Sequence, residues 1–346
     1  MAFTCRDVQG VFIAWRRLSR RTSILSQVLS LELFFVPDNP LYLKAGWRTW
    51  RFLSIRKPVL VFLQLPQGPL LAEAVVLSRR NRFKVVADVH TGFIYPTSIK
   101  EYVLNRPFHG FLRGVDLVLA HNLLQAELIK RKTRVPGEKV LLVYDPVPMI
   151  PAETKLPELN IDLSKAVVFP ASWAIDEPLD YVALEFLESQ VAKDHVLVIT
   201  GNWMRSRRLY GKLVRIIENK KARDKVILTG YMPDEEYYQL IKSCKAIIAM
   251  SSKEYTLPHA VWEAVAVEKP FITIETETML TELGRDYPCF FTMKPGSLKK
   301  TLELCIGEEY GIVQKAAKEK ARELKHKSQK SLENLVKELS EIQQRA

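Results

Sequence analysis

The sequence contains few cysteines and no long apolar run. Its cysteines stand far apart, with no Cys-x-x-Cys pair or Cys/His cluster, at Cys5, Cys244, Cys289 and Cys305. This spacing indicates neither a zinc site nor a disulfide framework. No apolar run approaches the ~18 residues that a membrane span needs, and the first ten residues, MAFTCRDVQG, lack the apolar core of a signal peptide. We therefore expect a reduced, cytoplasmic protein whose only membrane contact would be peripheral, at the inner membrane face.

The composition is that of a folded, basic protein. At 346 residues, two domains are expected, and 14 glycines and 19 prolines are too few for a disordered chain. The 51 Lys and Arg against 39 Asp and Glu give a net charge of +12, which favours anionic partners such as a sugar nucleotide, a lipid phosphate or an acidic membrane. General solubility explains the charge equally well, because the basic residues are spread along the chain. No nucleic-acid-binding motif is present, so we expect no nucleic-acid partner.

Short apolar segments alternate with segments of helical spacing along the chain. This alternation predicts βαβ units and parallel sheets. Three prolines within residues 144–151 predict an extended linker between two such halves. We expect an N-terminal Rossmann-like domain over 1–148, a C-terminal Rossmann-like domain over 149–310, and amphipathic helices over 311–346 that either cross back to the first domain or form a solvated tail.

One stretch, residues 226–282, combines strands and helices with a polar loop. The loop from Ser251 to Thr256 follows an expected strand, and ligands of open α/β sheets bind at the carboxyl ends of strands. The next helix opens at Pro258, where free N–H groups and the helix dipole suit a phosphate. Glu263 lies about one and a half turns inside this helix. Its carboxylate could accept hydrogen bonds from a ribose diol.

These residues carry a family resemblance. Glu254, Leu257-Pro258, Glu263-Ala264 and Lys269-Pro270 resemble the donor-site signature of GT-B glycosyltransferases, both of the retaining group-1 type and of the eukaryotic chitobiosyl-lipid β-1,4-mannosyltransferase type. The common pattern has seven residues between its two glutamates, whereas this sequence has eight. The extra residue lies just after Glu254, so the resemblance transfers a donor-binding role to Glu263 more directly than a role to Glu254.

The resemblance extends to other donor-side segments of the second half. The segment from Ser172 to Glu177 is similar to the Thr-Ser-Trp-x-x-Asp-Glu segment of the β-mannosyltransferase type, which implies that Ser172 contacts a diphosphate oxygen; Asp176 and Glu177 are expected as helix caps. Related sequences often have Gly-Lys where this one has Gly201-Asn202, so Arg205 is the substitute candidate for the donor phosphates. The implied donor-binding residues are Ser172, Gly201, Asn202, Arg205, Tyr231, Thr256, Leu257, Pro258 and Glu263.

Tyr231 has two interpretations. The turn that contains it meets the nucleotide base in the family, which implies stacking on the base. A buried core tyrosine explains the residue as well.

In the first half, Asp88 and His90 end an expected strand and are followed by Gly92. Two titratable groups at this position suit proton transfer or substrate contact. The segment is similar to the amino-terminal Asp-x-His motif of the β-mannosyltransferase type and to the His-Thr motif of group-1 enzymes. We predict that His90 touches the donor sugar or the acceptor hydroxyl, and that Asp88 orients it or is itself the base. His121 ends a neighbouring strand and is a further candidate for the same edge.

The loop after the first expected strand is rich in arginine where many GT-B enzymes have glycine. Arg16, Arg17, Arg20 and Arg21 could bind an acceptor phosphate, because guanidinium groups match phosphate oxygens. A solvated basic face, or a juxtamembrane patch without specificity, explains them too.

Residues 41–55 mix aromatic with basic side chains, among them Trp47, Trp50 and Arg51. This mixture suits a membrane interface. It suits a half-buried amphipathic helix equally.

Together the resemblance implies an α/β GT-B glycosyltransferase with two Rossmann-like domains facing across a cleft. It would move a sugar from a GDP- or UDP-sugar to a lipid-linked or glycan acceptor, with no cofactor and no metal site. An inverting reaction would use Asp88 or His90 as base, whereas a retaining one would use Glu254 and His90 to steady the sugar. The sugar, the nucleotide base, the acceptor and the stereochemistry stay open. The alternatives are a non-catalytic GT-B subunit that binds an anionic lipid or polysaccharide, and a GT-B-fold sugar-nucleotide epimerase.

Overall fold

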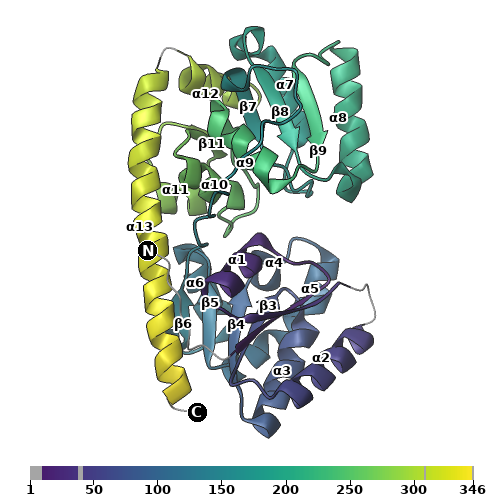
Figure 1. Cartoon of the computed structure of the whole chain (residues 1–346), viewed down its shortest axis with the longest axis vertical. Coiled ribbons are helices and arrows are strands. Elements are labelled where there is room, and N and C mark those ends of the chain that lie inside the picture. Colours follow the sequence, from purple (N-terminus) through teal and green to yellow (C-terminus); the bar gives the residue numbers. More distant parts are fainter. Residues whose placement is uncertain (1–9, 38–41, 308, 345–346) are drawn as a thin grey trace. The chain divides into compact units, whose positions relative to one another are not determined.

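A computed structural model describes residues 10–37, 42–307 and 309–344 (Figure 1). The chain divides into two compact units: unit 1 comprises Met1–Pro146 and Lys327–Ala346, and unit 2 comprises Val147–His326. Cys5 and the first residue of the 41–55 segment, Leu41, lie outside the described residues. No helix among the described residues is long and apolar enough to cross a membrane.

Unit 1 contains a six-stranded parallel sheet in the order β2-β1-β3-β4-β5-β6. The strands are β1 Gly10–Trp15, β2 Glu32–Val36, β3 Leu60–Leu65, β4 Lys84–Val89, β5 Leu117–Ala120 and β6 Val140–Leu142. The central strands β3 and β4 are almost entirely buried, as the near-continuous Val and Leu runs of parallel strands require.

Helices and short turns connect these strands. They are α1 Arg20–Val28, α2 Tyr42–Arg56, α3 Gly68–Asn81, α4 Thr91–Ile94, α5 Ile99–Asn105, the 3₁₀ segment η1 Arg106–Gly114, α6 Leu123–Thr133 and the 3₁₀ turn η2 Gly137–Lys139. The Asn122 side chain caps α6, because it accepts a hydrogen bond from the Gln125 amide at 2.9 Å.

Unit 2 contains a second six-stranded parallel sheet, in the order β12-β11-β10-β7-β8-β9. Its strands are β7 Ala166–Phe169, β8 Val196–Thr200, β9 Val226–Gly230, β10 Ala246–Ile248, β11 Phe271–Ile274 and β12 Phe290–Phe291. Its helices are α7 Leu179–Glu188, α8 Arg207–Asn219, α9 Asp234–Ser243, α10 His259–Val267, α11 Glu277–Leu283 and α12 Ser297–Ile306, with 3₁₀ turns η3 Leu163–Lys165, η4 Gln190–Lys193 and η5 Trp203–Ser206. Two parallel α/β sheets are thus confirmed.

The last helix, α13 Tyr310–Gln344, is one continuous helix of 35 residues. Leu335 and Leu339 are fully buried in the core of unit 1, beside Leu25 of α1 and Phe12 of β1. The Ser331 hydroxyl accepts a hydrogen bond from the Tyr144 amide at 3.2 Å. The final turns of the chain therefore complete the core of unit 1.

Two local expectations are wrong. Arg20 and Arg21 were expected in the loop after the first strand but belong to helix α1. The helix begins at Arg20 because the Ser19 side chain caps it by accepting a hydrogen bond from the Thr22 amide. The absence of disulfides is also wrong for one pair. Cys289 and Cys305 are bonded to each other, because β12 and α12 fold back and bring together residues 16 positions apart.

Candidate functional site

In unit 2, β7 and β10 pair in the middle of the sheet. The sheet grows from β7 through β8 and β9 on one side and from β10 through β11 and β12 on the other, so this pair is the topological switch point. Ligands of such sheets bind beyond the carboxyl ends of the strands at this switch point. The loops that follow β7 and β10 are tied together: the Ser251 hydroxyl donates to a carboxylate oxygen of Asp176 at 2.5 Å, and the Ser252 amide donates to the Asp176 carbonyl at 2.9 Å. The sequence-predicted polar loop is therefore held at the expected edge.

The loop after β7 is built around Glu177. One of its carboxylate oxygens accepts hydrogen bonds from the Ser172 amide at 3.1 Å and from the Ser172 hydroxyl at 2.7 Å. Helix α7 begins instead behind Pro178, with no side-chain cap, so the expected capping of this helix by Asp176 and Glu177 is wrong. Glu177 shapes the loop, and the Ser172 side chain remains exposed at its surface.

Gly201, at the end of β8, packs against this loop. It has φ of +91°, and a Cβ atom on it would lie 1.9 Å from the Ala171 carbonyl oxygen. Only glycine fits there. Trp173 also joins this loop to the end of β8, because its indole N–H donates to the Thr200 carbonyl at 3.0 Å.

The next candidates lie around the β8 and β9 ends. The Asn202 side chain accepts a hydrogen bond from the Met204 amide and caps η5, while the Arg205 side chain is exposed. Tyr231 is 74% exposed. Its interpretation as a buried core residue is therefore wrong, and its ring is free to meet a planar ligand.

Helix α10 carries Glu263 on its buried side. Pro258 is its N-cap, and Leu257 is buried beneath the turn. Glu263 is only 5% exposed, and one of its carboxylate oxygens accepts a hydrogen bond from the Tyr237 hydroxyl of α9 at 2.6 Å. The Nε2 atom of His259 lies 3.9 Å from its other oxygen. The carboxylate is thus fixed from one side.

Glu254 has a different environment from Glu263. Its carboxylate accepts hydrogen bonds from the Glu277 amide at 3.1 Å, the Thr278 amide at 3.3 Å and the Thr278 hydroxyl at 3.0 Å. Both oxygens therefore cap the N-terminus of α11. Thr256 lies two residues further, with its hydroxyl near the Glu254 carbonyl at 3.4 Å. These contacts give Glu254 a loop-fixing role that the sequence did not indicate.

In unit 1, five residues form one buried network, which we call the Arg21 cluster: Arg21, Asp88, His90, His121 and Asp145. The Arg21 Nε donates to both Asp88 oxygens at 3.0 and 3.2 Å, and its Nη1 donates to Asp145 at 2.8 Å. The imidazole Nε2 atoms of His121 and His90 lie 3.0 and 3.4 Å from the two Asp88 oxygens. The rings of His90 and His121 meet edge to face.

Charge decides the protonation states in this cluster. Burial alone would raise the pKa of Asp88, but the Arg21 guanidinium and His121 hold it well below its usual range. Burial, together with Arg21, lowers the pKa of His121. The carboxylate is therefore ionised and a weak base, and His121 is neutral at pH 7. His90 is the more accessible imidazole, with 23% of its side chain exposed.

Asp88, His90 and His121 could also hold a metal ion, because one ligand atom from each lies within 4.8 Å of the others. A divalent ion there would sit against the buried Arg21 guanidinium, which already neutralises Asp88. Like charges in a buried site are costly. The cluster is better suited to hold and orient the two imidazoles than to bind a cation.

The remaining candidates of the first half follow the ends of β1 and β4. They are Arg16, Arg17, Arg20 and Gly92. Gln64, at the end of β3, fixes the arginine-rich loop: its side-chain oxygen accepts from the Ser19 amide at 2.9 Å and its nitrogen donates to the Arg17 carbonyl at 2.7 Å. The Arg17 and Arg20 side chains are exposed, and Arg16 donates to the Tyr42 hydroxyl at 3.3 Å. Gly92 follows His90 at the start of α4.

Sequence reasoning missed Arg21 as the centre of the cluster. It grouped Arg21 with the solvated arginines of the loop, yet this side chain is 3% exposed and paired with two carboxylates. The helical spacing of Arg21 with Leu25, which is fully buried, was the available signal.

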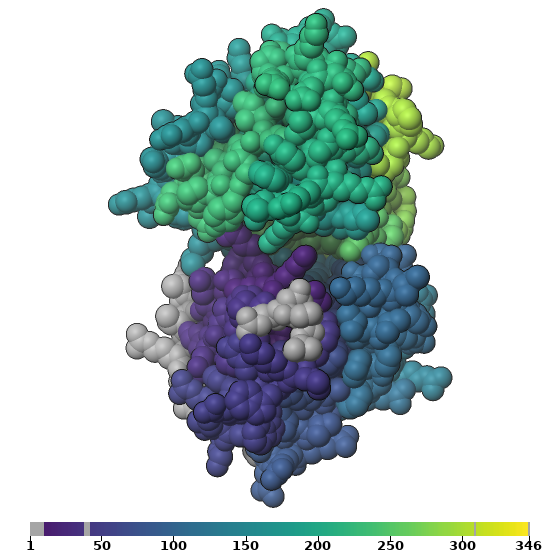
Figure 2. All heavy atoms as spheres, turned by 90° about the vertical axis from the view of Figure 1, so that its right-hand side faces the viewer, coloured from purple at the N-terminus to yellow at the C-terminus, as the bar shows by residue number. Residues whose placement is uncertain are grey.

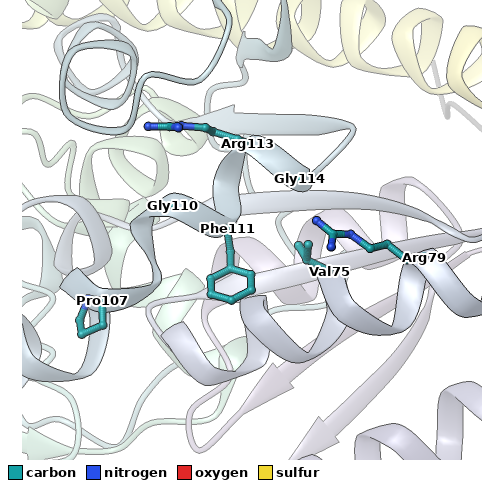
Figure 3. Close-up of a pocket in the computed structure, with 7 residues that line it drawn as sticks. All are labelled: Val75, Arg79, Pro107, Gly110, Phe111, Arg113 and Gly114. Carbon is teal, nitrogen blue, oxygen red and sulfur yellow. The ribbon is translucent and has the colours of Figure 1, made fainter.

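A groove of about 380 Å³ lies elsewhere in unit 1, between α3 and η1 (Figure 3). Its lining comprises Val75, Arg79, Pro107, Gly110, Phe111, Arg113 and Gly114. None of these residues belongs to the Arg21 cluster or to the sequence-predicted site. The groove therefore adds nothing to the site at the strand ends.

Comparisons with known proteins agree with this architecture. Residues 181–324 match the family model described as glycosyl transferases group 1. The structure is similar to Alr3699/HepE from Anabaena, solved in complex with UDP-glucose, with 13% identity, a TM-score of 0.71 and coverage of 94% of this chain and 98% of that one. Among curated proteins, no sequence matches the chain.

Two further solved structures have the same fold. Sucrose-phosphate synthase from Thermosynechococcus elongatus has 10% identity and a TM-score of 0.75, covering 95% of this chain and 98% of that one. A glycosyltransferase from Rickettsia africae has 12% identity and a TM-score of 0.66, covering 96% and 98%. At such identities the likeness establishes the fold, which is GT-B.

Proposed function

We propose that this GT-B chain, whose second unit matches the group 1 glycosyltransferases, transfers a sugar from a nucleoside-diphosphate sugar to a lipid-linked or glycan acceptor. The match and the fold are those of transferases. The observation that carries the proposal is the edge of unit 2, where Glu263 lies buried in α10 behind the interlocked loops after β7 and β10. UDP-sugar and GDP-mannose are both candidate donors; the complex of the Anabaena protein with UDP-glucose favours testing UDP-sugars first.

The donor would be held by several kinds of contact. The ribose diol would donate to Glu263, whose second oxygen is not used by Tyr237. The diphosphate would meet the N-terminal amides of α10 behind Pro258 and the exposed Arg205 side chain. The Ser172 hydroxyl donates to Glu177, so it would contact the diphosphate only after turning away from that carboxylate. The exposed Tyr231 ring would stack on the base. Helix amides and arginine would stabilise the charge that develops on the leaving diphosphate without a metal ion.

In unit 1, His90 would contact the reacting sugar or the acceptor hydroxyl. Asp88 is ionised but a weak base, because Arg21 neutralises it. It would therefore position His90 and His121 instead of removing a proton itself. The exposed Arg17 and Arg20 would attract an acceptor phosphate at the same edge of the sheet.

A second candidate is a non-catalytic GT-B subunit that binds an anionic lipid or polysaccharide. Two observations favour it. Both Glu254 oxygens cap α11, and the amide oxygen of Asn202, which stands where related sequences often have lysine, caps η5. These positions serve loop structure in this chain.

A thermal-shift panel of nucleoside diphosphates and sugar nucleotides, with and without Mg²⁺, separates the two candidates. A ligand at a hundred times its dissociation constant stabilises the fold by about 2.7 kcal/mol. Selective stabilisation by UDP, GDP or their sugars would support the donor site, and turnover of the same sugar nucleotide would establish the transferase. Nucleotide binding without turnover would favour the non-catalytic subunit. No response to any nucleotide would overturn the donor site.

A further inference from the structure

The outer face of α2 exposes large apolar side chains. Leu43, Trp47 and Trp50 follow one another at spacings of four and three residues, which places them on one side of the helix. They are 85%, 55% and 46% exposed, whereas Ala45 and Leu53 on the opposite side are buried. This helix thus has one apolar side that is buried and a second apolar side that is exposed among the described residues.

Basic residues flank this second side. Helix α2 carries Lys44, Arg48, Arg51 and Arg56 and no acidic residue. The Arg51 guanidinium lies over the Trp47 ring, 5.5 Å from its centroid. Tryptophan beside arginine or lysine on one helix face is the composition of an interfacial membrane helix.

A second helix of the same layer repeats the pattern. In α5, Ile99, Tyr102 and Val103 are 85%, 54% and 62% exposed, at spacings of three and four residues that share one side. Helix α3 contacts both α2 and α5 and exposes Val76 and two arginines. We call the apolar surface of these helices the α2–α5 face: Leu43, Trp47, Trp50, Val76, Ile99, Tyr102 and Val103. Figure 2 views unit 1 from the side on which α2 lies.

Little negative charge opposes this face. Glu73 is the acidic residue of α3, and burial raises its pKa to about 8, so it is mostly protonated at neutral pH. Glu101, the acidic residue of α5, accepts a hydrogen bond from the Thr97 amide at 2.8 Å. Glu32 of β2 pairs with Arg56 at 3.2 Å. Basic residues therefore outnumber the acidic ones on α2 and α3.

We infer that the α2–α5 face is a docking surface for a bilayer that contains anionic lipids. Tryptophan and tyrosine rings partition to the level of the lipid headgroups, and lysine and arginine beside them are attracted to anionic headgroups. A nucleic acid would satisfy the arginines but would leave Leu43, Ile99 and Val103 in water. Because no helix of the described residues can span a membrane, this contact would be peripheral. The inference does not depend on sugar transfer.

Co-sedimentation with vesicles tests the inference directly. We expect the full chain to bind vesicles of phosphatidylcholine with phosphatidylglycerol, to bind pure phosphatidylcholine far less, and to lose binding as salt rises. The double substitution Trp47→Ser, Trp50→Ser should weaken binding about tenfold or more, and Arg51→Gln about fivefold. The matched controls are Ile312→Ser, 69% exposed in α13, and Arg215→Gln, exposed in α8; both should bind like the parent chain.

Tryptophan fluorescence supplies a second readout. The chain has six tryptophans, of which Trp15, Trp173 and Trp262 are buried and Trp47 and Trp50 are the most exposed. Lipids brominated near the headgroup should quench the parent chain and not the double variant. Circular dichroism verifies that the variants fold.

Three outcomes would overturn the inference. They are equal binding to neutral and anionic vesicles, binding that the α2 variants leave unchanged, and concentration-dependent self-association that the double variant abolishes, since the face would then pair two copies of the chain. The nucleotide thermal shift of the double variant should match that of the parent chain. A failure here therefore leaves the donor-site proposal standing, and the reverse holds as well.

Discussion

The Nε–H of Arg21 is shared between the two carboxylate oxygens of Asp88, at 3.0 and 3.2 Å, in the interior of unit 1. The same guanidinium reaches Asp145 at 2.8 Å. One cation thus contacts two carboxylates. The stability of this edge of the sheet is tied to a single side chain.

Replacing Arg21 by Gln should destabilise unit 1 strongly. The substitution leaves the fully buried Asp88 without its guanidinium partner, and breaking a buried pair from one side costs about 3–5 kcal/mol. Urea unfolding measured by circular dichroism gives the change in free energy. The exposed Arg20, one residue earlier, supplies the matched control: Arg20→Gln should change stability by less than about 0.5 kcal/mol. Equal effects of the two substitutions would contradict the assignment.

His121 should make stability depend on pH below neutrality. Its pKa is lowered in the folded state, so below its unfolded pKa of about 6.5 the unfolded chain takes up a proton that the folded chain does not. Stability then rises with pH between the folded pKa and about 6.5, because the unfolded state binds more protons in that window. We expect His121→Gln to flatten this part of the curve of unfolding free energy against pH.

Other histidines set the background of that experiment. His109 and His195 also have lowered pKa values, mainly through burial, so part of the slope will remain in the variant. His326→Gln, at an exposed position of α13, is the control. A slope that His121→Gln and His326→Gln change equally would exclude His121 as a source.

Replacing His90 by Ala should lower turnover far more than donor binding. The His90 Nε2 lies 3.4 Å from Asp88 at the strand end. Its removal would delete a contact to the reacting groups, at a cost of about a hundredfold or more in kcat. Initial rates and nucleotide titration on the same preparation give both quantities. Full activity of the variant would remove His90 from the site.

Local signals sufficed for most of the fold. The buried Val and Leu runs predicted the strands, and the Asn122 cap and the Pro258 helix start were readable from neighbouring residues. Arg21 was misplaced because its partners lie 67 and 124 positions away in the sequence. The Cys289–Cys305 bond was not predicted either. The two cysteines are 16 positions apart, and that spacing does not show that the chain between them folds back.

The polar loop before α10 lies at the predicted edge of the sheet, but several of its contacts differ from those expected. Glu263 lies inside α10, as expected, and is buried there. The partners of Glu254 and Glu177 could not be predicted, because Glu254 reaches across to α11 and Glu177 turns back to Ser172. A charged side chain in a loop has many candidate partners, and only the packed structure selects among them.

Glu263→Gln should weaken donor binding with little loss of stability. The Gln side-chain oxygen can still accept the hydrogen bond of the Tyr237 hydroxyl, whereas a ribose diol would lose a charged acceptor, which costs about tenfold or more in affinity. Titration of the nucleotide that the thermal-shift panel selects gives the dissociation constant. Tyr237→Phe is the control for an indirect effect. It removes the hydrogen bond that the Tyr237 hydroxyl donates to Glu263 and leaves the charge of the carboxylate unchanged. Unchanged affinity in Glu263→Gln would end the ribose assignment.

Glu254 separates a loop-fixing role from a sugar-steadying one. Its carboxylate accepts two backbone amides and the Thr278 hydroxyl at the start of α11, so Glu254→Ala should cost about 0.5–2 kcal/mol of stability, as the loss of a helix cap does. If capping is its whole role, donor affinity and kcat, measured per folded molecule, will be unchanged. Thr278→Val keeps both amide contacts of Glu254 but removes the hydroxyl, which donates to Glu254 at 3.0 Å and accepts from the Tyr255 amide at 2.8 Å. It is therefore the control for a disturbed loop and should lose stability with normal turnover. A fall in kcat of a hundredfold in Glu254→Ala, with Thr278→Val unaffected, would instead place Glu254 at the transferred sugar and favour the retaining reaction.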